Sequence, residues 1–249
     1  MTISKRQSKS EGFTLVELAI VMIIIGLLIG GILKGQQMIE NAKVSSLIAQ
    51  VKAYQAALNT FKDTYAGTPG DIAKATDRIA NCDAATFCVD GDGNNLVGGA
   101  ADPIWTSIVT NRPETIQFWK HLVLANLITG VPADAATVAP FAWGDTHPAA
   151  SIGGGFEFYF DPLTTSGVSG HFLRLSNQGV SGGPVGSPGA SAVSPIAAHQ
   201  IDRKIDDGQP LRGSVMTNYG VTTDECNATA SMHQTSGRRT CVMFFLIDG

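Results

Sequence analysis

The sequence predicts an α+β fold in which one long N-terminal helix packs on an antiparallel sheet of about four strands. Three observations predict this fold. An apolar run of 21 residues, Phe13–Leu33, contains a single charged residue, and an amphipathic pattern then continues to about residue 66. Short apolar runs bounded by Gly, Pro and Ser follow in the second half of the chain and are typical of strands. A helix that is followed by several strands indicates an α+β domain.

The apolar run Phe13–Leu33 is long enough to cross a membrane. At ~1.5 Å per residue it forms a helix of roughly 31 Å, which matches a hydrocarbon core of about 30 Å. Lys5, Arg6 and Lys9 precede the run and favour a cytoplasmic N-terminus, so the rest of the chain lies outside that membrane. The run exceeds the apolar part of a secretory signal peptide and no Ala-x-Ala site follows it. We therefore expect this segment to remain in the product.

Glu17 is the one charged residue inside this run. A carboxylate in hydrocarbon costs on the order of several kcal/mol unless it has a partner, and such residues are therefore commonly functional. The alternative interpretation is a terminal glutamate whose side chain reaches the lipid headgroups. The residues that flank Glu17 decide between the two interpretations.

The stretch Gly12-Phe13-Thr14-Leu15-Val16-Glu17, with basic residues before it and an apolar helix after it, resembles the type III signal of type IV prepilins and type II secretion pseudopilins. The resemblance implies cleavage after Gly12 and N-methylation of the new N-terminal Phe13. It also implies that Glu17 pairs with the terminal amine of a neighbouring subunit during filament assembly. The implied fold is pilin-like. The implied partners are the prepilin peptidase/methyltransferase, other pilin or pseudopilin subunits, and an inner-membrane assembly platform.

The sequence departs from the common family pattern at two places. Glu11 puts a negative charge directly before the expected cleavage point, and Lys34 stands near the place where the family often has a proline. Glycines are expected to loosen the helix instead, because each costs roughly 1 kcal/mol of helix stability relative to alanine. These glycines are Gly26, Gly30, Gly31 and Gly35.

The helix is predicted to continue beyond the membrane to residue 66, where Gly67-Thr68-Pro69-Gly70 ends it. Apolar residues recur there at gaps of mostly three and four, which indicates one buried stripe. They are Val44, Leu47, Ile48, Val51, Tyr54, Leu58, Phe61 and Tyr65. We expect four parts: a leader at 1–12, a transmembrane or filament-core helix at 13–33, the amphipathic half of that helix at 34–66, and a periplasmic or extracellular globular domain at 67–249.

The globular part is predicted to contain a loop region, a second helix and four strands. The loop region covers residues 67–112. Pro113-Glu114 opens the second helix, because both residues suit a first helical turn, and Gly130 ends it. His121 is placed near the partly exposed face of that helix. The predicted strands are Phe156–Phe160, His171–Ser176, Ser214–Tyr219 and Thr240–Ile247, with a Gly/Ser/Pro-rich loop at 179–195.

Charge and cysteine usage limit the class of function. After removal of the leader, 14 basic residues face 20 acidic ones, a net charge of −6, which argues against an electrostatic nucleic-acid binder. The four cysteines, Cys82, Cys88, Cys226 and Cys241, contain no C-x-x-C pair. Two disulfides are expected in an oxidising periplasm, and of the three connectivities the two local ones are favoured.

Two acidic groups are candidates for metal binding. Asp90, Asp92 and Asn94 resemble the start of a calcium loop, because oxygen ligands at alternate positions suit a hard cation. An EF-hand would need Gly and Glu where Asn95 and Ala101 stand, so a different calcium loop and a plain polar turn both remain open. The second group, Asp202, Asp206 and Asp207, is predicted to lie in a turn.

The sequence contains no complete signature of an enzyme active site. Residues 179–183 match G-x-S-x-G, but the Gly/Pro-rich sequence that follows cannot form the helix that a nucleophile elbow requires. No histidines form an H-x-x-x-H pair. We predict a structural filament subunit that is not an enzyme. The alternative is a periplasmic enzyme or binding domain held by an uncleaved membrane helix, which would need neither the Gly12-Phe13 junction nor Glu17.

Overall fold

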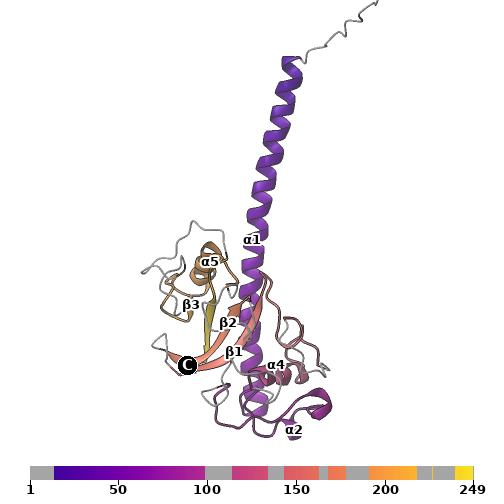
Figure 1. Ribbon diagram of the computed structural model, residues 1–249, viewed down its shortest axis with the longest axis vertical. Coiled ribbons are helices and arrows are strands. Elements are labelled where there is room, and N and C mark those ends of the chain that lie inside the picture. Colours follow the sequence, from indigo (N-terminus) through magenta and orange to yellow (C-terminus); the bar gives the residue numbers. More distant parts are fainter. Residues whose placement is uncertain are drawn as a thin grey trace, which may run out of the picture. The chain divides into compact units, whose positions relative to one another are not determined.

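The computed structural model describes residues 14–98, 114–133, 143–162, 168–177, 191–217, 226 and 239–248. The chain divides into two compact units, residues 1–42 and 43–249. The described helices are α1 (Leu15–Tyr65), α2 (Ala75–Arg78), α4 (Glu114–Leu124) and α5 (Pro195–Ile205), with a short 3-10 turn at Ala84–Thr86. The strands are β1 (Gly155–Pro162), β2 (Ser169–Ser176), β3 (Val215–Thr217) and β4 (Met243–Asp248) (Figure 1).

Helix α1 continues without a break through its four glycines. Apart from its neighbours in the helix, a Cβ atom added at any of them would meet no described atom within 4 Å, so no described tertiary contact requires glycine there. The helix ends at Tyr65, where Ala66 takes a positive φ of 47° and its N–H donates to the Lys62 carbonyl oxygen at 2.8 Å. These bounds lie within two residues of those predicted.

The four strands form one antiparallel sheet in the order β1-β2-β4-β3. Phe158 pairs with Leu173, Leu173 with Phe245, and Phe245 with Val215, so one apolar row crosses all four strands. The predicted α+β arrangement, a long N-terminal helix with a four-stranded antiparallel sheet, is confirmed.

The main core of residues 43–249 lies on the face of the sheet that carries this row. Buried side chains of α1, α4 and α5 all join it there. Tyr54 of α1 illustrates the packing, because its ring lies edge-on to Trp119 of α4 at 5.1 Å and to Phe156 of β1 at 5.3 Å. Alternate strand residues form a smaller cluster that includes Tyr159 and Phe172, as the period of two in a strand requires.

Helix α4 ends at Leu124, earlier than the predicted stop at Gly130. The N–H of Leu127 donates to the Leu122 carbonyl at 3.0 Å, and the N–H of Asn126 donates to Val123 at 2.9 Å. Asn126 adopts a positive φ of 57°. This hydrogen-bond pattern is a Schellman motif, in which asparagine takes the left-handed position that glycine usually holds. The prediction considered only glycine as a helix terminator, whereas asparagine ends this helix.

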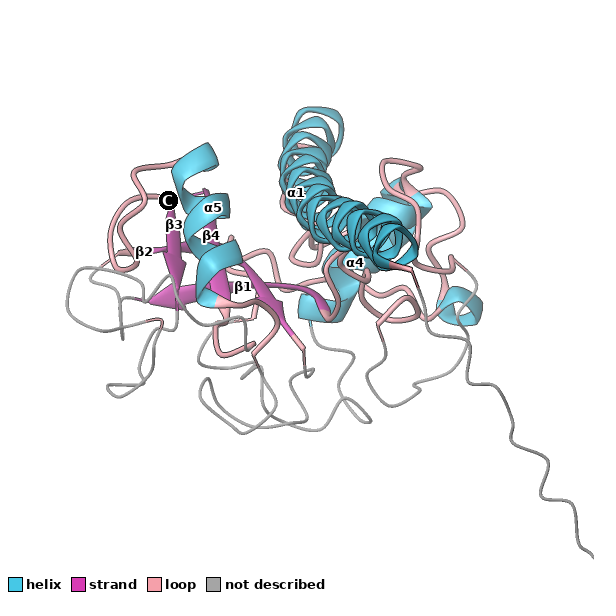
Figure 2. Ribbon diagram, turned by 90° about the horizontal axis from the view of Figure 1, so that it is seen from above, coloured by secondary structure: helices cyan, strands magenta, loops and turns pink. Residues whose placement is uncertain are grey.

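Helix α5 was not predicted. Ser194 caps it by accepting a hydrogen bond from Ala197 N, and Pro195 stands in its first turn. The helix lies beside β3 (Figure 2), and its side chains Ala198 and Ile201 are buried. Asp202 therefore belongs to a helix, and its predicted place in a turn was wrong.

The strand bounds differ from the predicted ones mainly at β4, which begins at Met243 and not at Thr240. The N–H groups of Thr240 and Cys241 both donate to the carbonyl of Val193, so this stretch pairs outside the main sheet. Strands β1 and β2 each extend beyond the predicted runs.

Candidate functional site

The first turn of α1 is closed by reciprocal hydrogen bonds between Thr14 and Glu17. The N–H and the hydroxyl of Thr14 both donate to Glu17 Oε2 at 2.9 Å. The N–H of Glu17 donates in return to Thr14 Oγ1 at 3.2 Å. This arrangement is a capping box, which satisfies N–H groups that the helix start would otherwise leave unpaired. Gly12 and Phe13 lie outside the described residues.

The apolar side chains in the first half of α1 are exposed in the described structure. Every large apolar side chain from Leu15 to Leu33 is exposed, with Leu15 at 86% and Leu27 at 73%. Among the described residues, α1 is the one helix long and apolar enough to cross a membrane, and none of its most apolar window is buried. A single apolar N-terminal helix of this kind indicates membrane anchoring.

The predicted calcium residues are regrouped in the structure. Asp90 Oδ1 accepts hydrogen bonds from Thr76 N at 2.8 Å and Thr76 Oγ1 at 3.0 Å. Asp92 instead meets Asp71 and Glu114, and one carboxylate oxygen from each lies within 4.8 Å of the others. Sequence reasoning missed Asp71 and Glu114, because 21 or more residues separate each of them from Asp92 and only the tertiary fold brings them together.

Backbone N–H groups already bind the carboxylates of this first acidic cluster, Asp71, Asp92 and Glu114. Asp71 accepts from Asn94 N and Asn95 N, both at 2.9 Å, and Glu114 accepts from Asp92 N at 3.1 Å. Burial raises the pKa of Asp71 and of Glu114, and the neighbouring Asp92 carboxylate raises both further. Such acidic groups are able to bind a metal ion, although their hydrogen bonds give them a structural role without one.

A second acidic cluster consists of Asp202, Asp206 and Asp207, at the C-terminal end of α5. One carboxylate oxygen from each residue lies within 4.8 Å of the others. The sequence placed these three residues together because they are close in the chain. It gave no indication that Asp202 is fully buried.

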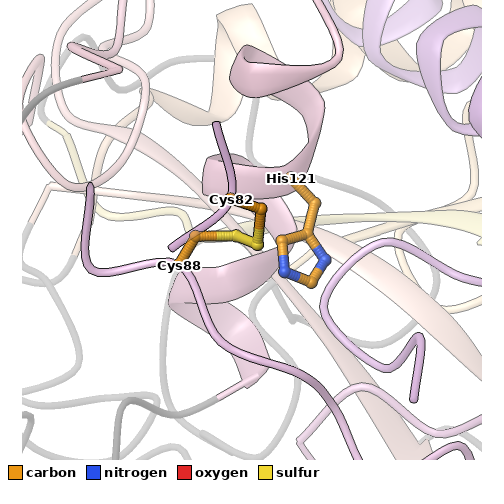
Figure 3. Close-up of side chains that lie close together, drawn as sticks. All are labelled: Cys82, Cys88 and His121. Atoms are coloured by element: carbon orange, nitrogen blue, oxygen red, sulfur yellow. A yellow bond between two sulfur atoms is a disulfide. The ribbon is translucent and has the colours of Figure 1, made fainter. Parts of the chain in front are cut away.

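The four cysteines form disulfides Cys82–Cys88 and Cys226–Cys241, with Cα–Cα distances of 4.9 and 5.7 Å. His121 lies beside the first pair (Figure 3). The two sulfur atoms are bonded to each other, so they are not free to hold a metal together with the histidine.

His121 is fully buried, so its predicted place near an exposed helix face was wrong. Its Nδ1 accepts from the N–H of Gly70 at 2.9 Å, so Nε2 carries the proton and donates to the Val89 carbonyl at 3.0 Å. Burial lowers the pKa of His121 to about 4. The ring therefore joins the loop after α1 to the loop after Cys88 as a neutral group.

The comparisons with known proteins recognise the N-terminal segment. Residues 7–33 match the model of the prokaryotic N-terminal methylation motif, the signature of type IV pilins and pseudopilins. The chain thus carries the signal of a type IV pilin-like or pseudopilin precursor, which implies processing by prepilin peptidase and assembly with other pilin subunits. The pilin class is structural rather than catalytic. Neither the curated proteins nor the solved structures gave a match.

Proposed function

We propose that this protein is a structural subunit of a type IV pilus or a type II secretion pseudopilus. The peptidase cleaves it between Gly12 and Phe13 and methylates the new amino group of Phe13. The subunit waits in the inner membrane with its globular domain in the periplasm, and an inner-membrane platform then adds it to a helical filament. The observation that carries this proposal is the exposed apolar half of α1, which contains one carboxylate and lies within a match to the N-terminal methylation motif.

The exposed helix suits both the subunit in the membrane and the subunit in the filament. In the membrane, lipid covers the apolar side chains on every side. In a filament, the corresponding helices of neighbouring subunits replace the lipid and bury the same surface. Apolar contacts alone give little register, because sliding one helix along another exchanges one apolar contact for the next.

Glu17 supplies the register that the apolar surface lacks. In the single chain its carboxylate is bound by Thr14. Cleavage creates a positively charged amine at Phe13, and in a filament core that amine on a neighbouring subunit neutralises the Glu17 carboxylate. Other staggers would leave a carboxylate buried without a countercharge, at a cost of several kcal/mol.

Processing tests the proposal directly. Intact mass and N-terminal sequencing of protein from cells with active prepilin peptidase should show a chain that begins at N-methylated Phe13. Gly12→Val should leave uncut precursor in the membrane, because a bulky side chain blocks the peptidase site, while Gly12→Ala serves as the small-residue control. A wild-type chain that still begins at Met1 would support the alternative of an uncleaved membrane anchor.

A further inference from the structure

The second acidic cluster, Asp202, Asp206 and Asp207, joins the end of α5 to the start of β3. Asp206 Oδ2 accepts hydrogen bonds from the N–H and hydroxyl of Ser214 and, at 3.1 Å, from the N–H of Val215. Asp207 Oδ1 accepts from Gln209 N at 2.7 Å. These hydrogen bonds fix the positions of the Asp206 and Asp207 carboxylates.

Asp202 differs from its two neighbours. It is 0% exposed, and neither of its carboxylate oxygens has a hydrogen-bond partner in the described structure. The backbone N–H of Gly208 favours its charged form without standing in good hydrogen-bond geometry. Burying a carboxylate without partners costs several kcal/mol, so such a group takes up either a proton or a cation.

The first acidic cluster provides an internal comparison. Asp71 is almost as buried, at 2% exposed, yet each of its oxygens accepts a backbone N–H. Its environment is therefore complete without a ligand. Within the described residues no N–H group stands in good hydrogen-bond geometry to Asp202, and one of its carboxylate oxygens lies close to two further carboxylates instead.

The three carboxylates lie close enough together to bind one hard cation. Oxygens that bind the same calcium ion at about 2.4 Å are separated by at most about 4.8 Å. One oxygen from each of the three aspartates lies within 4.8 Å of the others. Three carboxylates supplied by the protein suit Ca²⁺, because Mg²⁺ usually keeps several waters and is seldom held by protein ligands alone.

We propose that Asp202, Asp206 and Asp207 bind one hard divalent cation, Ca²⁺, with Asp202 as the buried ligand. The ion would give Asp202 the partner that it lacks in the described part of the chain. Because Asp206 is also hydrogen-bonded to Ser214 and Val215, the ion would fasten α5 to the start of β3. This proposal does not depend on filament assembly.

The competing explanation is a proton on Asp202. Burial raises the pKa of this carboxyl to about 7, and the charges of Asp207 and Asp206 contribute in the same direction. A protonated Asp202 would be indifferent to calcium. The amide of Asp202→Asn imitates the neutral form and therefore distinguishes a proton from a cation.

The test uses the full chain in uncharged detergent, freed of metal with a chelator and then titrated with CaCl₂ alone. We expect a rise in melting temperature and a calorimetric binding signal. Asp202→Asn should weaken binding at least tenfold, and so should Asp207→Asn, whose exposed position makes misfolding an unsuitable explanation. Asp92→Asn, in the first acidic cluster, is the matched control and should bind as wild type does.

Two results would overturn the proposal. One is a wild-type melting temperature that does not change up to about 10 mM calcium, above the range of weak extracellular calcium sites. The other is a calcium response that survives in Asp202→Asn and Asp207→Asn but disappears in Asp92→Asn. That outcome would place the ion in the first acidic cluster.

Discussion

The two halves of α1 carry similar apolar side chains but differ in what covers them. From Leu15 to Leu33 every large apolar side chain is exposed, whereas Leu47, Leu58 and Phe61 are at most 1% exposed. The second half places its apolar residues on one stripe, which a single domain is able to cover. The first half is apolar on all sides, so one domain packed against one face cannot cover it. This difference indicates that the first half is suited to being covered by lipid or by other subunits.

Matched leucine truncations should give the largest difference between the halves. Leu58→Ala creates a cavity in the core and should lower the free energy of unfolding by about 2–5 kcal/mol. Leu28 is 59% exposed, so Leu28→Ala should change it by less than about 0.5 kcal/mol. Urea unfolding in detergent, followed by tryptophan fluorescence, measures both. Similar losses for the two variants would contradict the division of α1 into a covered and an uncovered half.

The Cys82–Cys88 disulfide should stabilise only the covered half and its surroundings. Both cysteines belong to the core that includes Phe61. Replacing both by serine should lower the free energy of unfolding by roughly 2–3 kcal/mol, because the unfolded chain loses a constraint. Urea midpoints of the oxidised wild type and of the oxidised double variant measure the loss. Cleavage at Gly12 should be unaffected, and a processing defect would show that the two regions are coupled.

A smaller effect should appear as a pH dependence at His121, whose ring lies parallel to that of Phe61 at 6.4 Å. The folded pKa is lowered to about 4, so the stability that the neutral ring provides is complete above pH 6.5 and is lost as the pH falls toward 4. Between pH 7 and pH 5 the unfolded chain takes up a proton at His121 and the folded chain does not. This costs about 2 kcal/mol.

The His121→Gln variant isolates this contribution from other titrating groups. The difference in unfolding free energy between wild type and the variant should narrow by about 2 kcal/mol from pH 7 to pH 5. Urea unfolding at the two pH values measures that difference. If it stays constant, His121 is not held neutral in the folded protein.

The sequence predicted features that depend on neighbouring residues more successfully than those that depend on distant ones. The long helix, the four strands and the order helix-then-sheet follow from local patterns of period 3.6 and 2. Helix α5 was not predicted, although Ser194 and Pro195 are good starting signals for a helix. The Gly/Ser/Pro-rich sequence before it and the turn-forming residues Asp206 and Asp207 favoured a loop and a turn instead.

The candidate sites show the same limit. Glu17 was identified from a local motif, and its hydrogen bonds to Thr14 are local too. The first acidic cluster joins Asp71, Asp92 and Glu114 from three separate segments, which no sequence spacing reveals. The burial of Asp202 likewise depends on the packing of α5, a helix that was not predicted from the sequence.

Filament formation by Glu17→Ala tests most directly whether the exposed half of α1 is an assembly element. The variant and wild type should be produced together with their assembly system, sheared from the cells or released from the periplasm, and examined by electron microscopy. Immunoblots report membrane insertion and cleavage. Glu40→Ala is the matched control, since Glu40 is an exposed glutamate of the same helix beyond the membrane segment.

Glu17→Ala should be inserted and cleaved normally but should form few or no filaments, because the buried pair with the Phe13 amine is lost. Glu40→Ala should form filaments in wild-type amounts. A normal filament yield from Glu17→Ala would contradict the assembly role of this carboxylate and would favour a side chain that merely reaches the lipid headgroups.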